Sequence, residues 1–499
     1  MSSTLTALAR AAAVASGTAQ RTCTVRHVHI SPRPLVLVLL ALAGEANAPL
    51  AVMAGDHPEE PNLLVVPEPR DRDQRFAFVA DLAAVILPYI QSFATEEEPA
   101  GGREPDTRYA DAAQLLVPNP AGIAFTRLLG RSTRFRRTDG PYAVPESVPL
   151  LGRWLTFLTE RTDSPASSLM LAMTDALTAH WATGQSAVED RSLGSLLGWI
   201  DPPPGMSGAQ AAAAAEDPAR CPPAGPATDP TFDNEILDQR ILAIRTARFT
   251  GDGRAYERAK TALTDALATQ LQPTWTQMWR AVRLLRGLPE GGHVQARWDA
   301  DKAAYTWHVR HIRDGGPPQP RRDGAVSAAR RLANLERVAE MVAAQRAFDD
   351  PLVMAEYQMT GEAFAGLVIA AEPDRVEATG RRRVLRPRVT VETNDEVTAE
   401  PGTKLTSPAR PRQTARMMNA AQVGGRTRIV LELQGGMGRS LTPEPCSVPT
   451  IGESVCYAAF GDGYQPPPAF PEPEDTPWTH GGPPPEYVPA DEDAREDWS

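Results

Sequence analysis

The pattern of apolar and polar residues begins with a stretch in which strand-like runs precede a helix. Apolar runs occupy Leu35–Leu42, Leu50–Met53 and Leu63–Val66, and a helical stripe follows at Phe76–Phe93. Periodicity alone does not distinguish a buried strand from a buried helix at Leu35–Leu42. We therefore predict a small α/β unit over residues 26–98.

The pattern then becomes helical for most of the chain. Residues 108–200 are predicted to form a helical domain, with an apolar stripe at Leu169, Met173, Leu177 and Trp181. Residues 201–231 are rich in Pro and Ala, which predicts a linker. Residues 232–361 carry further stripes separated by Pro and Gly, and these favour an antiparallel helical array or a stalk.

From residue 364 to residue 462 the pattern changes to short β-branched runs, which predicts a small β-barrel-like module. The expected strands are Ala365–Ala371, Val384–Thr393, Arg412–Asn419, Arg426–Leu433 and Cys456–Phe460. Pro387 has no backbone N–H and should shorten the second of these strands. Gly424 and Gly425 should form a hairpin turn before the strand at Arg426.

Neither end of the chain has a pattern that could build a core. Residues 1–25 are small and polar and are predicted to be disordered, with a weak helix at Leu5–Ala15 as the alternative. Residues 463–499 hold ten Pro, nine Asp or Glu and one Arg, which is typical of a disordered acidic tail. The predicted fold class is multi-domain α+β, with a small α/β unit, a mainly helical middle, a β-barrel-like module and a tail.

Composition and charge narrow the classes of function. The formal net charge of −11 argues against a protein that coats nucleic acid, although it permits a local basic site. Only three of the 51 basic residues are Lys, a bias that makes an Arg cluster a weaker sign of phosphate recognition. The four Cys residues are dispersed, which disfavours a disulfide framework. The apolar run from Pro34 to Gly44 is too short to span a bilayer, so we predict a cytoplasmic protein without a membrane partner.

The β-module holds a local excess of positive charge. Between Arg375 and Arg428 there are twelve Lys or Arg residues against five Asp or Glu. The candidate nucleic-acid-binding residues are Arg386, Arg388, Arg412, Arg416, Arg426 and Arg428. Arg386 and Arg388 occupy alternate positions, so one face of a strand would present them to a phosphate backbone. The alternative is a solvated Arg-rich surface with no ligand.

No catalytic motif stands out in the sequence. The Gly-rich stretch at 435–440 lacks the Lys and the helix of a phosphate-binding loop. His308 and His311 stand one helical turn apart without a third ligand, and we interpret them as an ordinary pair. Trp275 and Trp279 have the spacing of a helix core and not of a base-stacking platform. We expect no cofactor and no metal site.

The favoured interpretation is a non-enzymatic accessory protein that contacts nucleic acid, or a nucleic-acid-processing enzyme, through the basic β-module. A helicase or a nuclease is the expected kind of protein partner, and Trp498 in the acidic tail is the candidate partner-binding residue. One alternative is a protein–protein scaffold with no nucleic-acid role. Another is a metal-dependent hydrolase or nuclease that uses the N-terminal carboxylates of Glu45, Asp56, Glu59, Glu60 and Glu68.

Overall fold

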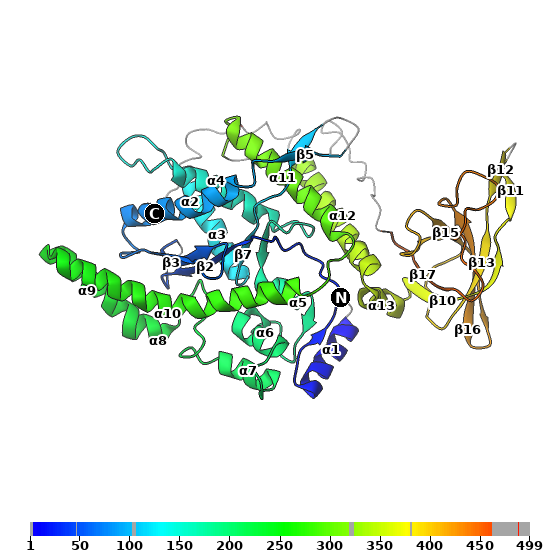
Figure 1. The fold of residues 1–499 in the computed structure, drawn as a ribbon, viewed down its shortest axis with the longest axis horizontal. Helices are drawn as coiled ribbons and strands as arrows, with labels where there is room; N and C mark the ends of the chain where they lie inside the picture. Colours follow the sequence, from blue (N-terminus) through cyan, green and yellow to red (C-terminus); the bar gives the residue numbers. More distant parts are fainter. Residues whose placement is uncertain are drawn as a thin grey trace.

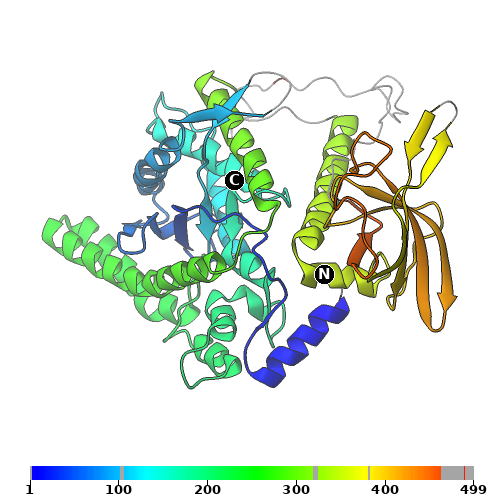
Figure 2. The ribbon, with the colours of Figure 1, turned by 45° about the vertical axis from the view of Figure 1, so that its right-hand side comes forward.

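The chain folds into an α/β body, a helical connection and a closed β-barrel (Figure 1). The computed structural model describes residues 3–45, 47–101, 106–318, 324–379, 382–461 and 488. The barrel stands to one side of the body, and helices α12 and α13 lie between the two (Figures 1 and 2). The fold class is therefore multi-domain α+β, as the sequence predicts.

A five-stranded sheet of order β4-β3-β2-β7-β8 forms the centre of the α/β body. Its strands are β2 Leu35–Ala41, β3 Pro49–Gly55, β4 Asn62–Val65, β7 Leu115–Val117 and β8 Met170–Ala172. The first three strands form an antiparallel meander, whereas β7 and β8 run parallel to β2. The ambiguous apolar run at Leu35–Leu42 is thus a strand.

Strand β2 is apolar along its length because helices cover both faces of the sheet. Odd-numbered positions from Leu35 to Leu39 pack into one core, and even-numbered positions from Val36 to Leu40 pack into the other. This division follows from the two-residue period of a strand.

Helices cover both faces of the sheet. The first face carries α2 Arg72–Gln91, α3 Pro120–Thr133, α4 Ser147–Arg161 and α11 Val294–Arg313. The second face carries α5 Met173–Thr178, α6 Leu193–Ile200, α9 Asp238–Thr250 and α10 Gly253–Arg286. Gly251 ends α9 at a φ of +69°, and the Asp252 carboxylate then caps α10 by accepting the Ala255 N–H at 2.9 Å.

Smaller elements surround this body. They are helices α1 Ser3–Ser16, α7 Gly208–Ala215 and α8 Pro230–Phe232, with helical turns at Glu189–Arg191 and Asp233–Leu237. Two short antiparallel pairs join β1 Gln20–Arg21 to β9 Trp181–Ala182, and β5 Glu97–Pro99 to β6 Thr107–Tyr109.

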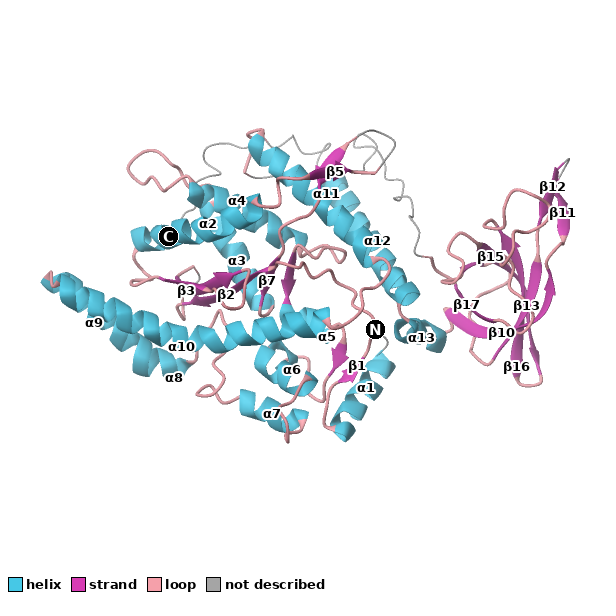
Figure 3. Cartoon of the chain, in the orientation of Figure 1, coloured by secondary structure: helices cyan, strands magenta, loops and turns pink. Residues whose placement is uncertain are grey.

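The barrel has six strands in the closed order β10-β13-β16-β15-β14-β17 (Figure 3). The strands are β10 Ala363–Glu372, β13 Arg388–Thr393, β14 Lys404–Thr406, β15 Thr414–Val423, β16 Arg426–Gln434 and β17 Ser454–Ala458. A separate hairpin consists of β11 Val376–Thr379 and β12 Arg382–Leu385. Gly424 and Gly425 have φ values of +61° and +82°, as the predicted two-residue turn requires. Pro387 separates β12 from β13 within the run predicted as one strand.

The connection consists of α12 Ala325–Asp349 and α13 Pro351–Met359, with Asp350 between them. A small apolar cluster lies where this joint, the N-terminal segment and the barrel meet. Its members include Cys23, Ala347, Val353, Met354, Ala363 and Ala458. The barrel is therefore packed against the same joint that receives the N-terminal segment.

Several predicted boundaries differ from the structure. Within residues 1–25, Ser3–Ser16 is helical, close to the alternative prediction of a weak helix. Residues 26–98 and 108–200 do not form separate units, because β7 and β8 share the sheet of β2. The apolar stripe from Leu169 to Trp181, predicted as helical, forms a strand, a short helix and a second strand. The four-residue spacing of its apolar residues is compatible with this combination as well as with a single helix.

The predicted linker, residues 201–231, contains α7 and packs against the body, where the Ala41 N–H donates to the Pro226 carbonyl at 2.9 Å. The predicted tail, residues 463–499, lies outside the described residues except for Val488. Among the helices that the structure describes, none has the length and apolar character needed to cross a bilayer.

Candidate functional site

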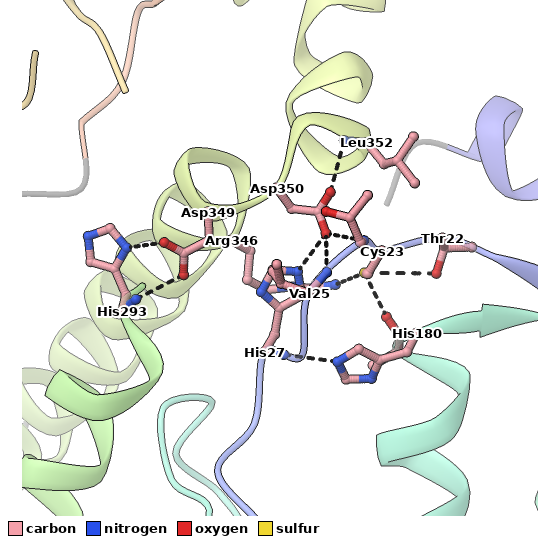
Figure 4. A network of polar contacts seen from close by, with 12 residues as sticks. Thr22, Cys23, Val25, His27, His180, His293, Arg346, Asp349, Asp350 and Leu352 are labelled. Atoms are coloured by element: carbon pink, nitrogen blue, oxygen red, sulfur yellow. Dashed lines mark hydrogen bonds and ion pairs between the residues drawn. The ribbon is translucent and has the colours of Figure 1, made fainter. Parts of the chain in front are cut away.

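A buried polar cluster forms where the N-terminal segment meets the joint between α12 and α13 (Figure 4). We call it the joint cluster, and it consists of Cys23, His27, His180, Arg346 and Asp350. Its residues come from distant parts of the chain, since Thr24 and Asp350 are 326 residues apart.

Asp350 holds two backbone segments together. Its side chain accepts the Leu352 N–H at 2.9 Å, which caps α13. Its other oxygen accepts the N–H groups of Thr24 at 2.5 Å and Val25 at 3.2 Å. Because a buried carboxylate needs such donors, Asp350 fixes both the start of α13 and the path of the N-terminal segment.

Cys23 and His27 face this carboxylate. The His27 Nε2 lies 3.6 Å from the Asp350 Oδ2, and the Cys23 thiol donates to the Ala179 carbonyl at 3.3 Å. Cys23, His27 and Asp350 each offer one potential ligand atom, and these three atoms lie within 4.8 Å of one another. No second group of three His, Cys, Asp or Glu residues with such spacing occurs in the described part of the chain.

The ring of His27 is buried, yet neither of its nitrogens has a hydrogen-bond partner. Its backbone is held on two sides. The backbone N–H of His27 donates to the Nε2 of His180 at 2.9 Å. The Arg297 guanidinium donates to the backbone carbonyl of His27 at 3.0 Å. The main chain that carries this unpartnered ring is therefore held in place.

Burial sets the protonation states of the joint cluster. It lowers the pKa of His27 to about 3, and Arg346 acts in the same direction. It lowers the pKa of His180 to about 4. Burial also raises the pKa of the Cys23 thiol, an effect that Arg346, 3.9 Å from Sγ, opposes. At neutral pH both imidazoles are accordingly neutral, and the thiol keeps its proton.

The outer face of the barrel is a second candidate site. Lys404 pairs with Arg416 across β14 and β15, and both Arg416 and Arg388 lie opposite Glu432 of β16. Cross-strand partners point to the same side of a sheet, and Val389 and its neighbours fill the interior. This row of charged side chains therefore faces outward, and we call it the barrel face, together with Arg412, Arg426 and Arg428.

Carboxylates neutralise part of the barrel face. Glu432 is shared by Arg375 at 2.9 Å and Arg388 at 3.4 Å, and Glu392 is shared by Arg426 and Arg428 at 2.9 Å each. The two arginines also lower the pKa of Glu392 through hydrogen bonds. Arg375 also pairs with Glu377 at 3.7 Å, so two carboxylates balance the two arginines around Glu432. Around Glu392, one carboxylate meets two arginines, which leaves an excess of one positive charge.

The remaining predicted nucleic-acid residues differ in their surroundings. Lys404, Arg412 and Arg416 are exposed and make no ion pair with any described residue. Arg386 is half-buried and donates to the Leu385 carbonyl at 3.1 Å. The structure therefore places Arg388, Arg416, Arg426 and Arg428 on strands of the barrel, Arg412 in the exposed turn before β15, and Arg386 beside the barrel face. Trp498 lies outside the described residues.

The N-terminal carboxylates do not gather into a metal-binding group. Glu45 pairs with Arg70 at 2.9 Å, Asp56 with Arg33 at 3.3 Å, and Glu68 with Arg248 at 2.8 Å. Glu59 and Glu60 are exposed. Separate ion pairs of this kind leave no shared space for a cation among these residues.

The pair His308 and His311 is held by aromatic packing. The ring of His308 stacks on Phe157 with centroids 4.1 Å apart, and it meets the edge of Trp154 at 4.7 Å. His308 is buried, and this burial lowers its pKa to about 3. Trp275 and Trp279 are likewise buried in the core on the second face of the sheet.

The burial of His308 should make the protein less stable in acid. Below pH 6.5, the ordinary pKa of histidine, His308 takes up a proton in the unfolded chain but stays neutral in the folded protein. The free energy of unfolding therefore decreases as the pH falls from 6.5 towards 3. Between pH 7 and pH 5 the loss should be about 2 kcal/mol. In urea unfolding, His308→Phe should lose about 2 kcal/mol less than the wild type over this interval. Equal losses would contradict this assignment.

Comparison with known proteins gave no match in family models, curated proteins or solved structures.

Sequence reasoning missed the joint cluster, although two weak signals were present. Cys23 and His27 are separated by three residues, a spacing that can place two ligands together. Asp350 precedes Pro351, the usual order of a helix cap and a first helical residue. Nothing in a single sequence connects these two signals, because the fold alone brings them together.

Proposed function

We propose that the protein is a non-enzymatic accessory factor that contacts the phosphate backbone of nucleic acid through the barrel face. The observation that carries this proposal is the excess of positive charge there. Glu392 meets two arginines, and Lys404, Arg412 and Arg416 have no carboxylate partner among the described residues. Phosphate groups would supply the missing negative charge.

The chemistry of the barrel face favours contact without sequence readout. Its outward side chains are charged, polar or aliphatic, and the aromatic rings of Phe364 and Tyr457 are buried inside the barrel. Base stacking needs exposed rings, whereas phosphate contact needs only cations. Binding should therefore depend steeply on salt and weakly on base sequence.

The test removes the three cations that have no ion pair. The full-length triple variant Lys404→Ala, Arg412→Ala, Arg416→Ala should bind nucleic acid roughly ten- to a hundredfold more weakly than the wild type at ~50 mM salt. The slope of log affinity against log salt should fall by about one for each phosphate that the variant no longer neutralises. Fluorescence anisotropy with a labelled duplex and a labelled single strand measures both quantities.

A matched control removes the same charge elsewhere. Arg240, Arg245 and Arg258 are exposed on α9 and α10, at the other end of the molecule from the barrel, and make no ion pair with a described residue (Figure 1). The variant with all three changed to Ala should bind as the wild type does. Equal loss in both variants, or wild-type binding that ignores salt, would reject the barrel face and favour a protein–protein scaffold.

The same proposal extends to location and partners. We place the protein in the cytoplasm, beside a helicase or a nuclease that acts on the bound nucleic acid. The acidic tail with Trp498 is the segment we expect that partner to recognise, because its net negative charge would not compete with the partner for phosphate.

A further inference from the structure

We propose that Cys23, His27 and Asp350 bind one divalent transition-metal ion, zinc by the chemistry of the ligands, and that this ion ties the N-terminal segment to the joint between α12 and α13. The proposal is independent of nucleic-acid binding, because the joint cluster lies outside the barrel face. It adds a metal site where the sequence alone predicts none.

The donor set selects the class of metal. A thiolate, an imidazole nitrogen and a carboxylate oxygen are the ligands that zinc accepts in proteins, at bond lengths of about 2.0 to 2.3 Å. Hard cations such as magnesium and calcium prefer oxygen ligands, so the thiol of Cys23 disfavours them.

The geometry is close to that of a tetrahedral site. Ligand atoms around a tetrahedral zinc ion stand on the order of 3.5 Å apart. The three candidate atoms already lie within 4.8 Å of one another, and the His27 Nε2 is 3.6 Å from the Asp350 Oδ2. Small rotations of the Cys23 and His27 side chains would bring the three ligand atoms to bonding distance from one ion. A water molecule would take the fourth position.

His27 supplies a second, independent observation. Its side chain is 3% exposed, and both ring nitrogens lack a hydrogen-bond partner. Buried polar atoms without partners are rare, because each costs free energy that water would otherwise provide. A metal ion bound to one nitrogen would give this ring a partner.

Metal binding requires His27 as a neutral imidazole and Cys23 as a thiolate. Cys23 must lose its proton, so zinc binding forms an S–Zn bond, breaks the S–H bond and releases one proton to solvent. The thiolate and the carboxylate together balance the two charges of the ion.

Neighbouring groups would orient the ligands. The Asp350 carboxylate accepts the backbone N–H groups of Thr24 and Val25 at Oδ2 and that of Leu352 at Oδ1, which leaves a further lone pair on Oδ1. The Arg346 guanidinium points to the Cys23 Sγ at 3.9 Å, where it can donate to a thiolate. Hydrogen bonds of this kind hold metal ligands in position and favour their charged form.

The experiment uses the full-length protein purified with zinc in every buffer and then freed of loose metal by gel filtration. Mass spectrometry of the metal content should find about one zinc ion per chain. Replacement of zinc by cobalt should give the near-ultraviolet charge-transfer absorption of a thiolate–cobalt bond together with the visible bands of a tetrahedral ion. These two measurements need no variant, so a variant that fails to fold cannot obscure them.

Variants then assign the ligands. Cys23→Ser should lose the charge-transfer band, and His27→Gln should lower the bound zinc at least tenfold. Cys456→Ser is the matched control, since Cys456 is another unpaired thiol that burial keeps protonated, and it should retain both signals. A wild-type protein without stoichiometric zinc and without the cobalt band, or a Cys23→Ser variant that keeps them, would overturn the proposal and leave the joint cluster as a purely hydrogen-bonded contact.

Discussion

Replacing Trp275 by Ala should lower the free energy of unfolding by about 3–5 kcal/mol. Trp275 lies in α10 with 1% of its surface exposed, and it packs on the second face of the sheet. Its indole N–H donates to the Pro58 carbonyl at 2.8 Å, and its ring meets the edge of Trp279 at 5.9 Å. The variant therefore removes buried apolar packing, creates a cavity and leaves a carbonyl without its donor.

Trp307 provides the comparison, because it is the same residue type in an exposed place. It lies on α11 with 61% of its surface exposed and stacks on His311. Trp307→Ala should change the free energy of unfolding by no more than about 0.5 kcal/mol. Urea unfolding followed by far-ultraviolet circular dichroism measures both variants. Equal costs would mean that α10 does not cover the sheet as the structure shows.

Asp350→Ala should cost about 3–5 kcal/mol when measured with a chelator present, so that no metal contributes. The variant removes an acceptor shared by the N–H groups of Thr24, Val25 and Leu352. Those donors are left in a buried site without water to replace the carboxylate. The N-terminal segment should also become open to proteolysis, because Asp350 holds its backbone against the joint.

Asp252→Ala separates the capping role from the connecting role of Asp350. Asp252 also caps a helix, yet it is exposed and accepts only the Ala255 N–H. Its replacement should cost about 1 kcal/mol, the usual loss for a helix cap. If Asp350→Ala costs no more than Asp252→Ala, then the bonds from Asp350 to the N-terminal segment contribute nothing to stability.

The sequence predicts the barrel because its signals are local. Gly424 and Gly425 mark a two-residue turn, and alternating residues around Val389 mark an inside and an outside. The runs at β3 and β4 also predict strands, whereas the apolar run at β2 fits a strand or a helix equally well. Strands β7 and β8 are not predicted, because each has only three residues, too few to show the alternation of a strand.

The barrel face and the joint cluster also differ in how far local sequence patterns predict them. Alternation along one strand predicts the exposed arginines of the barrel face, although it does not reveal that Glu432 and Glu392 partly neutralise them. Cross-strand register decides that point, and register depends on pairing between strands far apart in the sequence. The joint cluster depends on still more distant contacts, so single-residue patterns around Cys23 and Asp350 do not predict it.

The distance along the chain between Thr24 and Asp350 also bears on how the protein emerges from the ribosome. At about 5–20 residues per second, translation needs roughly 15–65 s to add the 326 residues between them. During that time the central sheet can assemble on the nascent chain, since β8 ends at Ala172. Until Asp350 is synthesised, the N–H groups of Thr24 and Val25 must remain hydrated or be protected by a chaperone. Closure of the joint is thus a late step in biogenesis, and a truncated product that stops before residue 350 would release its N-terminal segment to quality-control proteases.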